Sequence, residues 1–312
     1  MSFFRRFAFL ATSATYLLIF IGGLVRVSGA GLGCPDWPKC FGRWMPPLSR
    51  AQLPADIDPV LFNITLSWIE YINRLFGVLI GILIFITALL AVKYYRNVKS
   101  IVMMSMGAVL LTGFQGWYGS IVVSQKLNPF AVSVHMGIAL IIVSMLIYVT
   151  QKAYYLEFPE IEKNAVYPGK IMFMTGGLWI LSVIQIVLGT RVRAGIEIET
   201  EIEPLAGIHE IIERVGSVEN LHALLGIGLL FGTIHVGVSI LKHSQNPSLI
   251  MRQGVWAMIV LVLAQLTGAL VIVLTDLPAI MQLFHLWTAS LYIGMVTVVM
   301  IAFLEGKGEK IQ

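Results

Sequence analysis

Long apolar segments separated by short polar ones dominate the chain. Eight of them approach or exceed the roughly 20 apolar residues that a transmembrane helix needs, at residues 7–25, 67–92, 101–123, 130–151, 171–190, 216–241, 254–275 and 279–303. The pattern therefore predicts an all-α membrane protein with eight transmembrane helices. We interpret the first segment as a retained helix, since no small-residue cleavage site of a signal peptide follows it.

Composition agrees with this class. The chain is 57% hydrophobic and only 12% charged, against about 25% charged residues in soluble domains. We find no nucleotide-binding glycine loop, no Walker motif and no soluble catalytic domain. No Arg- and Ser-rich transit segment precedes the first helix, which favours a bacterial inner membrane over an organelle.

The basic residues predict the orientation. Twelve of the 21 Lys and Arg residues, but only five of the 17 acids, belong to the N-terminus, the loops 93–100, 152–170 and 242–253, and the tail with Lys307 and Lys310. Because cytoplasmic loops are enriched in Lys and Arg, we place both termini in the cytoplasm. The net charge of +4 is then a topology signal, and we expect membrane lipid and no nucleic acid as a partner.

The chain has the organisation of a tandem duplication. Residues 1–151 and 171–312 each hold four predicted helices, joined by a cytoplasmic linker at 152–170, so the two four-helix bundles form a parallel repeat. Matching features recur in the same order in the two halves: Gly22 to Arg26 and Gly189 to Arg193; Glu70-x-x-Asn73 and Glu219-x-x-His222; Gln115 and Gln265, each 20 residues before His135 and His285.

Three histidines lie about two turns inside apolar segments that enter the membrane from the same side. Buried polar residues in a membrane helix are costly and usually functional. His222 and His285 are predicted at one depth, which suits two axial ligands of one heme iron in a four-helix bundle. His135 has the same depth in the first half, where Asn73 occupies the place of a fourth histidine. The alternative for each is a hydrogen-bonded core residue; His209, His235 and His243 are interpreted as solvated or structural.

Several other polar side chains are candidates for function, and for Glu70, Arg26 and Arg193 an alternative remains. Glu70 is a candidate acid or base, or an ion-pair partner of Arg74 or of a neighbouring helix. Glu219 is a candidate partner for a histidine. Arg26 and Arg193 are candidate contacts for anionic groups such as heme propionates, or they only reach toward the membrane interface. The acidic run 197–203 in the predicted external loop has no role that we can derive.

The two cysteines, Cys34 and Cys40, lie in the first external loop. Five residues separate them and two prolines stiffen the turn. A disulfide suits this spacing and an oxidising compartment. A pair of free thiols is the alternative.

At this point the residues resemble a known family. The segment 22–40, GGLVRVSGAGLGCPDWPKC, and the segment 70–77, EYINRLFG, are similar to heme A synthases, as are the single histidines in the fourth, sixth and eighth helices. The resemblance covers essentially the whole chain.

The resemblance implies a function. Heme A synthases are eight-helix oxidoreductases that convert a methyl group of heme O into the formyl group of heme A by two successive hydroxylations and loss of water. It implies a heme b cofactor held by His222 and His285, and a heme O site in the first half with Glu70 and His135. It also implies heme O synthase as the source of the substrate and cytochrome oxidase, with its assembly factors, as the destination of the product.

One position departs from the family pattern. Many members have Glu-x-x-His-Arg in the second helix, whereas this chain has Asn73 at that place. Either His135 alone binds the substrate iron, or Asn73 only hydrogen-bonds in that pocket. A non-catalytic b-type cytochrome that exchanges electrons with quinone is the main alternative function, and a transporter is the third.

Overall fold

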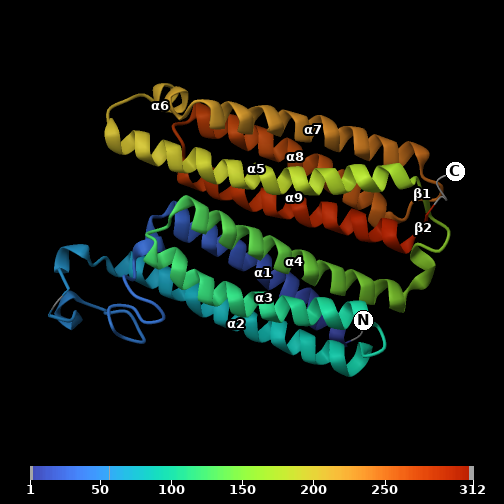
Figure 1. Ribbon diagram of the computed structural model, residues 1–312, viewed down its shortest axis with the longest axis horizontal. Coiled ribbons are helices and arrows are strands. Elements are labelled where there is room, and N and C mark those ends of the chain that lie inside the picture. Colours follow the sequence, from blue (N-terminus) through green and yellow to red (C-terminus); the bar gives the residue numbers. More distant parts are fainter. Residues whose placement is uncertain (1–2, 56, 309–312) are drawn as a thin grey trace.

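Nine α-helices make up most of the computed structural model, which describes residues 3–55 and 57–308 (Figure 1). Eight are long and apolar enough to cross a membrane: α1 (Phe3–Val27), α2 (Ile64–Tyr95), α3 (Lys99–Ser124), α4 (Pro129–Glu157), α5 (Gly169–Ile202), α7 (Ser217–His243), α8 (Leu249–Leu274) and α9 (Ala279–Glu305). The prediction of an all-α membrane protein is confirmed, and the chain is a multi-pass membrane protein.

Polar residues start several of these helices. The side chains of Asn63, Asn128 and Ser248 each accept a hydrogen bond from a backbone N–H in the first turn of α2, α4 and α8. Such caps satisfy amide groups that have no partner inside the helix. Pro129 is the first residue of α4, a position where its missing N–H costs nothing.

The long helices pack in two neighbouring groups. α1 and α3 each contact α2 and α4, and α5 and α8 each contact α7 and α9. The groups meet where α1 and α4 pack on α9, and where α4 packs on α5 (Figure 1). The common origin of the two groups by duplication stays a prediction.

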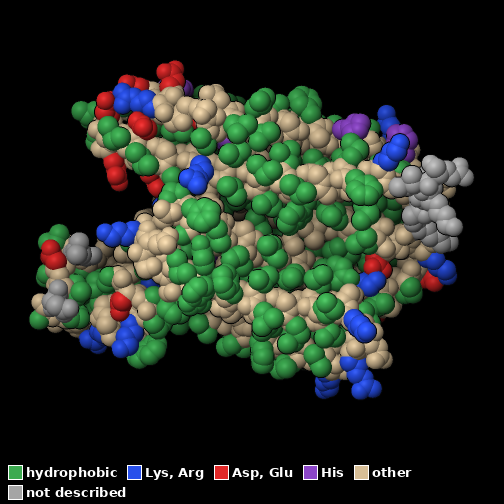
Figure 2. Space-filling model, in the orientation of Figure 1, with side chains coloured by type: hydrophobic (Ala, Val, Ile, Leu, Met, Phe, Trp, Pro, Cys, Tyr) green, Lys and Arg blue, Asp and Glu red, His purple; other side chains and the backbone are tan. Residues whose placement is uncertain are grey.

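The surface of the molecule matches a membrane environment. Hydrophobic side chains cover the middle of the helices, while charged side chains gather toward the two ends (Figure 2). Among the exposed apolar residues are Leu110, in the middle of α3, and Phe173, near the start of α5, which are 71% and 76% exposed. Lys310, which contributed to the predicted orientation, lies outside the described residues.

The prediction for the end of the fifth membrane helix is wrong. α5 does not end near residue 190 but continues to Ile202, so most of the acidic run is helical. Pro204 comes two residues later, and a proline disfavours helical backbone in the residue before it. A short amphipathic helix, α6 (Ile208–Val215), follows before α7 begins.

A buried carboxylate anchors the linker between the two groups. Glu162 is 2% exposed and accepts hydrogen bonds from the hydroxyls of Tyr155, Tyr167 and Ser248, at 3.1, 2.6 and 2.6 Å. Burial raises the pKa of the Tyr167 hydroxyl, so it remains a donor. Tyr167 belongs to a short strand, β1 (Val166–Tyr167), which pairs in parallel with β2 (Lys307–Gly308). The linker is thereby fastened to the second group.

Candidate functional site

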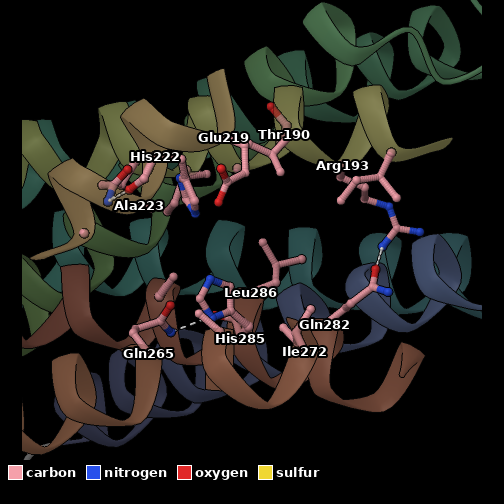
Figure 3. A pocket seen from close by; sticks show the side chains of 18 of the residues that line it. Thr190, Arg193, Glu219, His222, Ala223, Gln265, Ile272, Gln282, His285 and Leu286 are labelled. Carbon is pink, nitrogen blue, oxygen red and sulfur yellow. Dashed lines mark hydrogen bonds between the residues drawn. The ribbon is translucent and has the colours of Figure 1, made fainter. Parts of the chain in front are cut away.

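Two imidazole rings face one another between α7 and α9. The ring centroids of His222 and His285 are 6.4 Å apart, with 66° between the ring planes (Figure 3). Two imidazoles on opposite sides of one iron need about 6 Å between ring centres, because each metal–nitrogen bond is about 2 Å long and the ring radius is about 1 Å. The pair therefore has the separation that axial ligation of a heme requires.

These rings lie in a large cavity. Its volume is about 600 Å³, and its walls come mainly from α5, α7, α8 and α9, within the range of about 300–1,000 Å³ that is usual for ligand sites. α1 and α4 also reach it through Arg26, Val132 and Met136. The lining is mostly apolar, and its charged residues are two arginines, Arg26 and Arg193, and two acids, Glu197 and Glu219. A flat, mostly apolar ligand fits it, and the arginines are the groups that can meet an acidic edge.

Both rings have nitrogen atoms available for a ligand. Nδ1 of His222 and Nδ1 of His285 are buried without a hydrogen-bond partner, and neither ring makes a hydrogen bond within the described part of the chain. Neither ring nitrogen is thus committed to another protein group, and Nε2, which is not among the fully buried atoms, is left free for a ligand. Glu219 lines the same cavity but does not bond to the ring of His222, so the expected support of a histidine by this residue is not present.

Glutamine side chains tie each histidine's helix to a neighbour. Gln265 Nε2 donates to the carbonyl oxygen of His285 at 2.7 Å, and Gln185 Nε2 donates to that of His222 at 2.9 Å. In the first group, Gln115 Nε2 donates to the carbonyl oxygen of His135 at 2.8 Å. These bonds fix the depth of all three histidines.

A glycine on an adjacent helix lies close to each of four side chains, which we call the ligand-type positions: His222, His285, His135 and Asn73. A β-carbon placed on Gly189 would lie 3.3 Å from His222, and one on Gly268 would lie 3.7 Å from His285. In the first group, the corresponding distances are 3.8 Å from Gly119 to His135 and 4.0 Å from Gly22 to Asn73. The close approach of backbone to side chain is thus common to both groups, and Asn73 occupies the fourth place.

The mouth of the cavity carries an ion-pair cluster. Glu197 Oε2 accepts from Arg26 Nη2 at 2.6 Å, and Glu197 Oε1 accepts from Arg193 Nε at 3.1 Å. Arg193 Nη1 also donates to Gln282 Oε1 at 2.7 Å (Figure 3). The structure therefore brings both predicted arginines to the histidine cavity, and the extension of α5 supplies the acid between them.

Glu70 lies elsewhere, beneath the loop that joins α1 to α2. It is 3% exposed, its Oε1 lies 2.5 Å from Arg74 Nη2, and its Oε2 accepts from the backbone N–H of Cys34 at 2.8 Å. Arg74 Nη1 donates to the carbonyl oxygens of Asp36 and Lys39, both at 2.9 Å. The ion pair between Glu70 and Arg74 is present, and it holds the loop onto α2.

The loop itself is closed by the disulfide that the spacing predicts. Cys34 and Cys40 are joined, with their Cα atoms 4.8 Å apart, and both side chains are buried. Asp36 accepts from the backbone N–H groups of Phe41 and Gly42 at 2.6 and 2.9 Å, which completes a compact turn.

His135 and Asn73 do not line the cavity of His222 and His285. The ring of His135 stacks on Tyr118 from α3, with centroids 6.4 Å apart and 21° between planes. Its Nδ1 and the Oδ1 of Asn73 are buried without hydrogen-bond partners. His235, interpreted as structural, is exposed on α7 and does not pack in the core.

Sequence reasoning missed two residues of the site. Gln185 stands 37 residues before His222, so the 20-residue spacing shared by Gln115 and Gln265 does not reveal it. Glu197 was visible only as one acid of a run. The signal that was available is its position four residues after Arg193, which places both side chains on one helical face.

Comparisons with known proteins agree with this arrangement. Residues 5–297 match the family described as cytochrome oxidase assembly protein (COX15-CtaA). A heme A synthase of Geobacillus kaustophilus is 25% identical over 300 residues, covering 95% of this chain and 90% of that protein. One from Wolbachia sp. subsp. Brugia malayi is 25% identical over 316 residues, covering 89% of this chain and 90% of that protein. One from Shewanella oneidensis is 36% identical over 144 residues, covering 43% and 41%. The resemblance seen in the sequence is confirmed: the chain belongs to the COX15-CtaA family, in which its relatives are heme A synthases.

Proposed function

We propose that this protein is a heme A synthase, which acts on heme O and oxidises one porphyrin methyl group to a formyl group. The observation that carries the proposal is the facing pair of His222 and His285 in a heme-sized cavity, in a chain whose relatives bear this name. The reaction consists of two successive hydroxylations followed by loss of water.

The second group of helices, within 171–312, is the proposed heme b site. His222 and His285 would hold the iron. Arg26 and Arg193 would pair with the propionate carboxylates of the heme at the cavity mouth. The bound heme supplies one-electron chemistry. Gln185 and Gln265 keep the two helices in register, so that both rings stay at one depth.

The first group, within 1–151, is the proposed heme O site, with His135 as the iron ligand and Asn73 in the same pocket. Glu70 is the proposed catalytic residue. Its carboxylate is held between the Arg74 guanidinium and the Cys34 N–H, so it keeps a fixed place under the disulfide loop. From there it moves a proton or stabilises positive charge that develops on the substrate.

The cellular setting follows from the same proposal. We place the protein in the bacterial inner membrane with both termini in the cytoplasm, which puts both ligand sites near the outer surface. Heme O synthase would deliver the substrate, and cytochrome oxidase with its assembly factors would receive heme A.

Pigment extraction tests the proposal. The full chain is expressed in a host that makes heme O but no heme A, and the extracted hemes are identified by chromatography and mass. We expect heme A or its hydroxylated precursor from the unchanged chain. Heme b alone, beside plentiful unconverted heme O, would contradict the proposal and favour a b-type cytochrome.

Glu70→Gln tests the catalytic assignment in the same host. We expect conversion to fall by at least about 100-fold, the usual minimum for an acid–base group, while the heme b spectrum is kept. Glu201→Gln is the matched control, because Glu201 is an exposed acid on α5. Normal turnover by Glu70→Gln would remove this carboxylate from the mechanism.

A further inference from the structure

Asn73 is the exception in an otherwise uniform fourfold arrangement. Each ligand-type side chain lies against a glycine of the adjacent helix, and at three of the four places the side chain is an imidazole. Asn73 has the same position relative to Glu70 that His222 has relative to Glu219, three residues further along the helix. Asn73 therefore stands where the second axial ligand of the first group belongs.

An asparagine is a poor ligand for heme iron. Its amide oxygen is a hard, neutral donor, whereas heme iron is normally held by imidazole, thiolate or thioether groups. The side chain is also shorter than that of histidine, so it reaches less far from its helix. A heme iron held by His135 would therefore meet a short amide in place of a second imidazole.

The amide has unused hydrogen-bonding capacity. Oδ1 of Asn73 is buried without a partner, and Asn73 makes no side-chain hydrogen bond in the part of the chain that the structure describes. An amide also carries two N–H donors. A hydrogen-bond donor beside a heme iron influences which external ligands bind to the iron.

We infer that the first group contains a binding site for a small external ligand of the iron, opposite His135 and beside Asn73. The inference rests on the proposed function, because the iron is that of the bound heme O. The ligand class is a diatomic or similarly small molecule with a donor atom for iron, and Asn73 donates a hydrogen bond to its outer atom. The second group lacks this site, since His222 and His285 take both sides of the iron there.

Carbon monoxide is the probe. The full chain is purified without oxygen from cells that make heme O, so that heme O stays unconverted, and its heme b and heme O are quantified by extraction. After reduction, we expect carbon monoxide to change the spectrum of an amount of heme equal to the heme O content and to leave heme b unchanged. The two hemes in one molecule are each other's control.

Two variants address the role of Asn73. Asn73→His should keep heme O and abolish the carbon monoxide response, because a second imidazole closes the site. Asn73→Leu should keep that response but weaken cyanide binding to the oxidised protein about tenfold, the equivalent of one lost hydrogen bond. The second variant keeps the test meaningful if the first does not fold.

The outcomes separate the two proposals. Heme O that is present but insensitive to carbon monoxide contradicts the open site alone and leaves the proposed function standing. An unchanged response in Asn73→His, or unchanged cyanide affinity in Asn73→Leu, contradicts the assignment of Asn73. Absence of heme O from the purified protein overturns both proposals.

Discussion

The two histidine-bearing regions share a framework and differ in their contents. In each, a glutamine fixes a histidine's backbone and a glycine packs against its ring, as Gln265 and Gly268 do for His285 and as Gln115 and Gly119 do for His135. In the second group another imidazole, His222, completes the pair, whereas the first group has Asn73. One framework thus supports a closed pair of ligands and, by our inference, an open one.

The two regions also differ in the polar groups near each site. The second region is covered by a cluster in which Glu197 bridges Arg26 and Arg193. In the first region, Glu70 and Arg74 of α2 hold a disulfide loop in place. Fixed arginines at a cavity mouth suit retention of an anionic cofactor, whereas a buried carboxylate under a loop suits chemistry on a substrate. We therefore expect mutations in the second region to weaken heme b binding and mutations in the first region to leave it unchanged.

The largest expected effect comes from removing one ligand of the closed pair. His285→Ala should lower heme b affinity by at least about 100-fold, since the loss of a mere second-layer partner already costs about 10–100-fold in metal affinity. His135→Ala should leave heme b in place. Heme b content and the low-spin absorption spectrum of the purified proteins are the measurements.

His235→Ala is the matched control, because this histidine lies exposed on α7, away from the cavity. It should retain the wild-type spectrum. If His285→Ala retained it too, the cofactor would have to be held elsewhere.

A smaller effect distinguishes the glycines of the two regions. Gly189→Ala would place a β-carbon 3.3 Å from the ring of His222, so the ring must shift. An off-rotamer side chain costs about 0.5–1.5 kcal/mol, which should weaken heme b binding about 2- to 10-fold. Gly22→Ala meets Asn73 only at 4.0 Å and should leave heme b binding unchanged, with a gain of up to about 1 kcal/mol in helix stability.

Heme dissociation rates and thermal unfolding of the two alanine variants check this prediction. Equal effects on heme b would mean that the ring of His222 relaxes freely. A large loss of stability in Gly22→Ala would mean that the first region is packed more tightly than the contact distances indicate.

Much of this comparison was accessible from the sequence, for a definite reason. Membrane helices need long apolar runs, so buried polar residues stand out, and counting along the helices predicted that His222 and His285 lie at one depth, where the structure brings them together. The disulfide followed from the short spacing of Cys34 and Cys40. These features are local or depend only on helix length.

Features that depend on helix rotation and on distant partners were not accessible. The pairing of Gln185 with His222 and of Glu197 with Arg26 joins residues on different helices without a repeated spacing. The extension of α5 to Ile202 was missed because its acids suggest a loop, while in the structure Glu197 is neutralised by two arginines. The contact of Glu70 with Cys34 spans 36 residues and depends on how the loop folds over α2.

The smallest expected effect concerns the glutamines that both regions share. Gln115→Leu and Gln185→Leu each remove one donor to a histidine carbonyl, which should lower the free energy of unfolding by about 0.5–1.5 kcal/mol. Because the bonds fix backbone depth and do not touch the rings, the spectrum of bound heme b should shift little in either variant. Its dissociation should accelerate only in Gln185→Leu, since Gln185 lines the cavity proposed for heme b and Gln115 does not. A dissociation rate that rises equally in both would mean that the two regions are coupled through α4 and α5, which pack together, and that they do not hold their ligands independently.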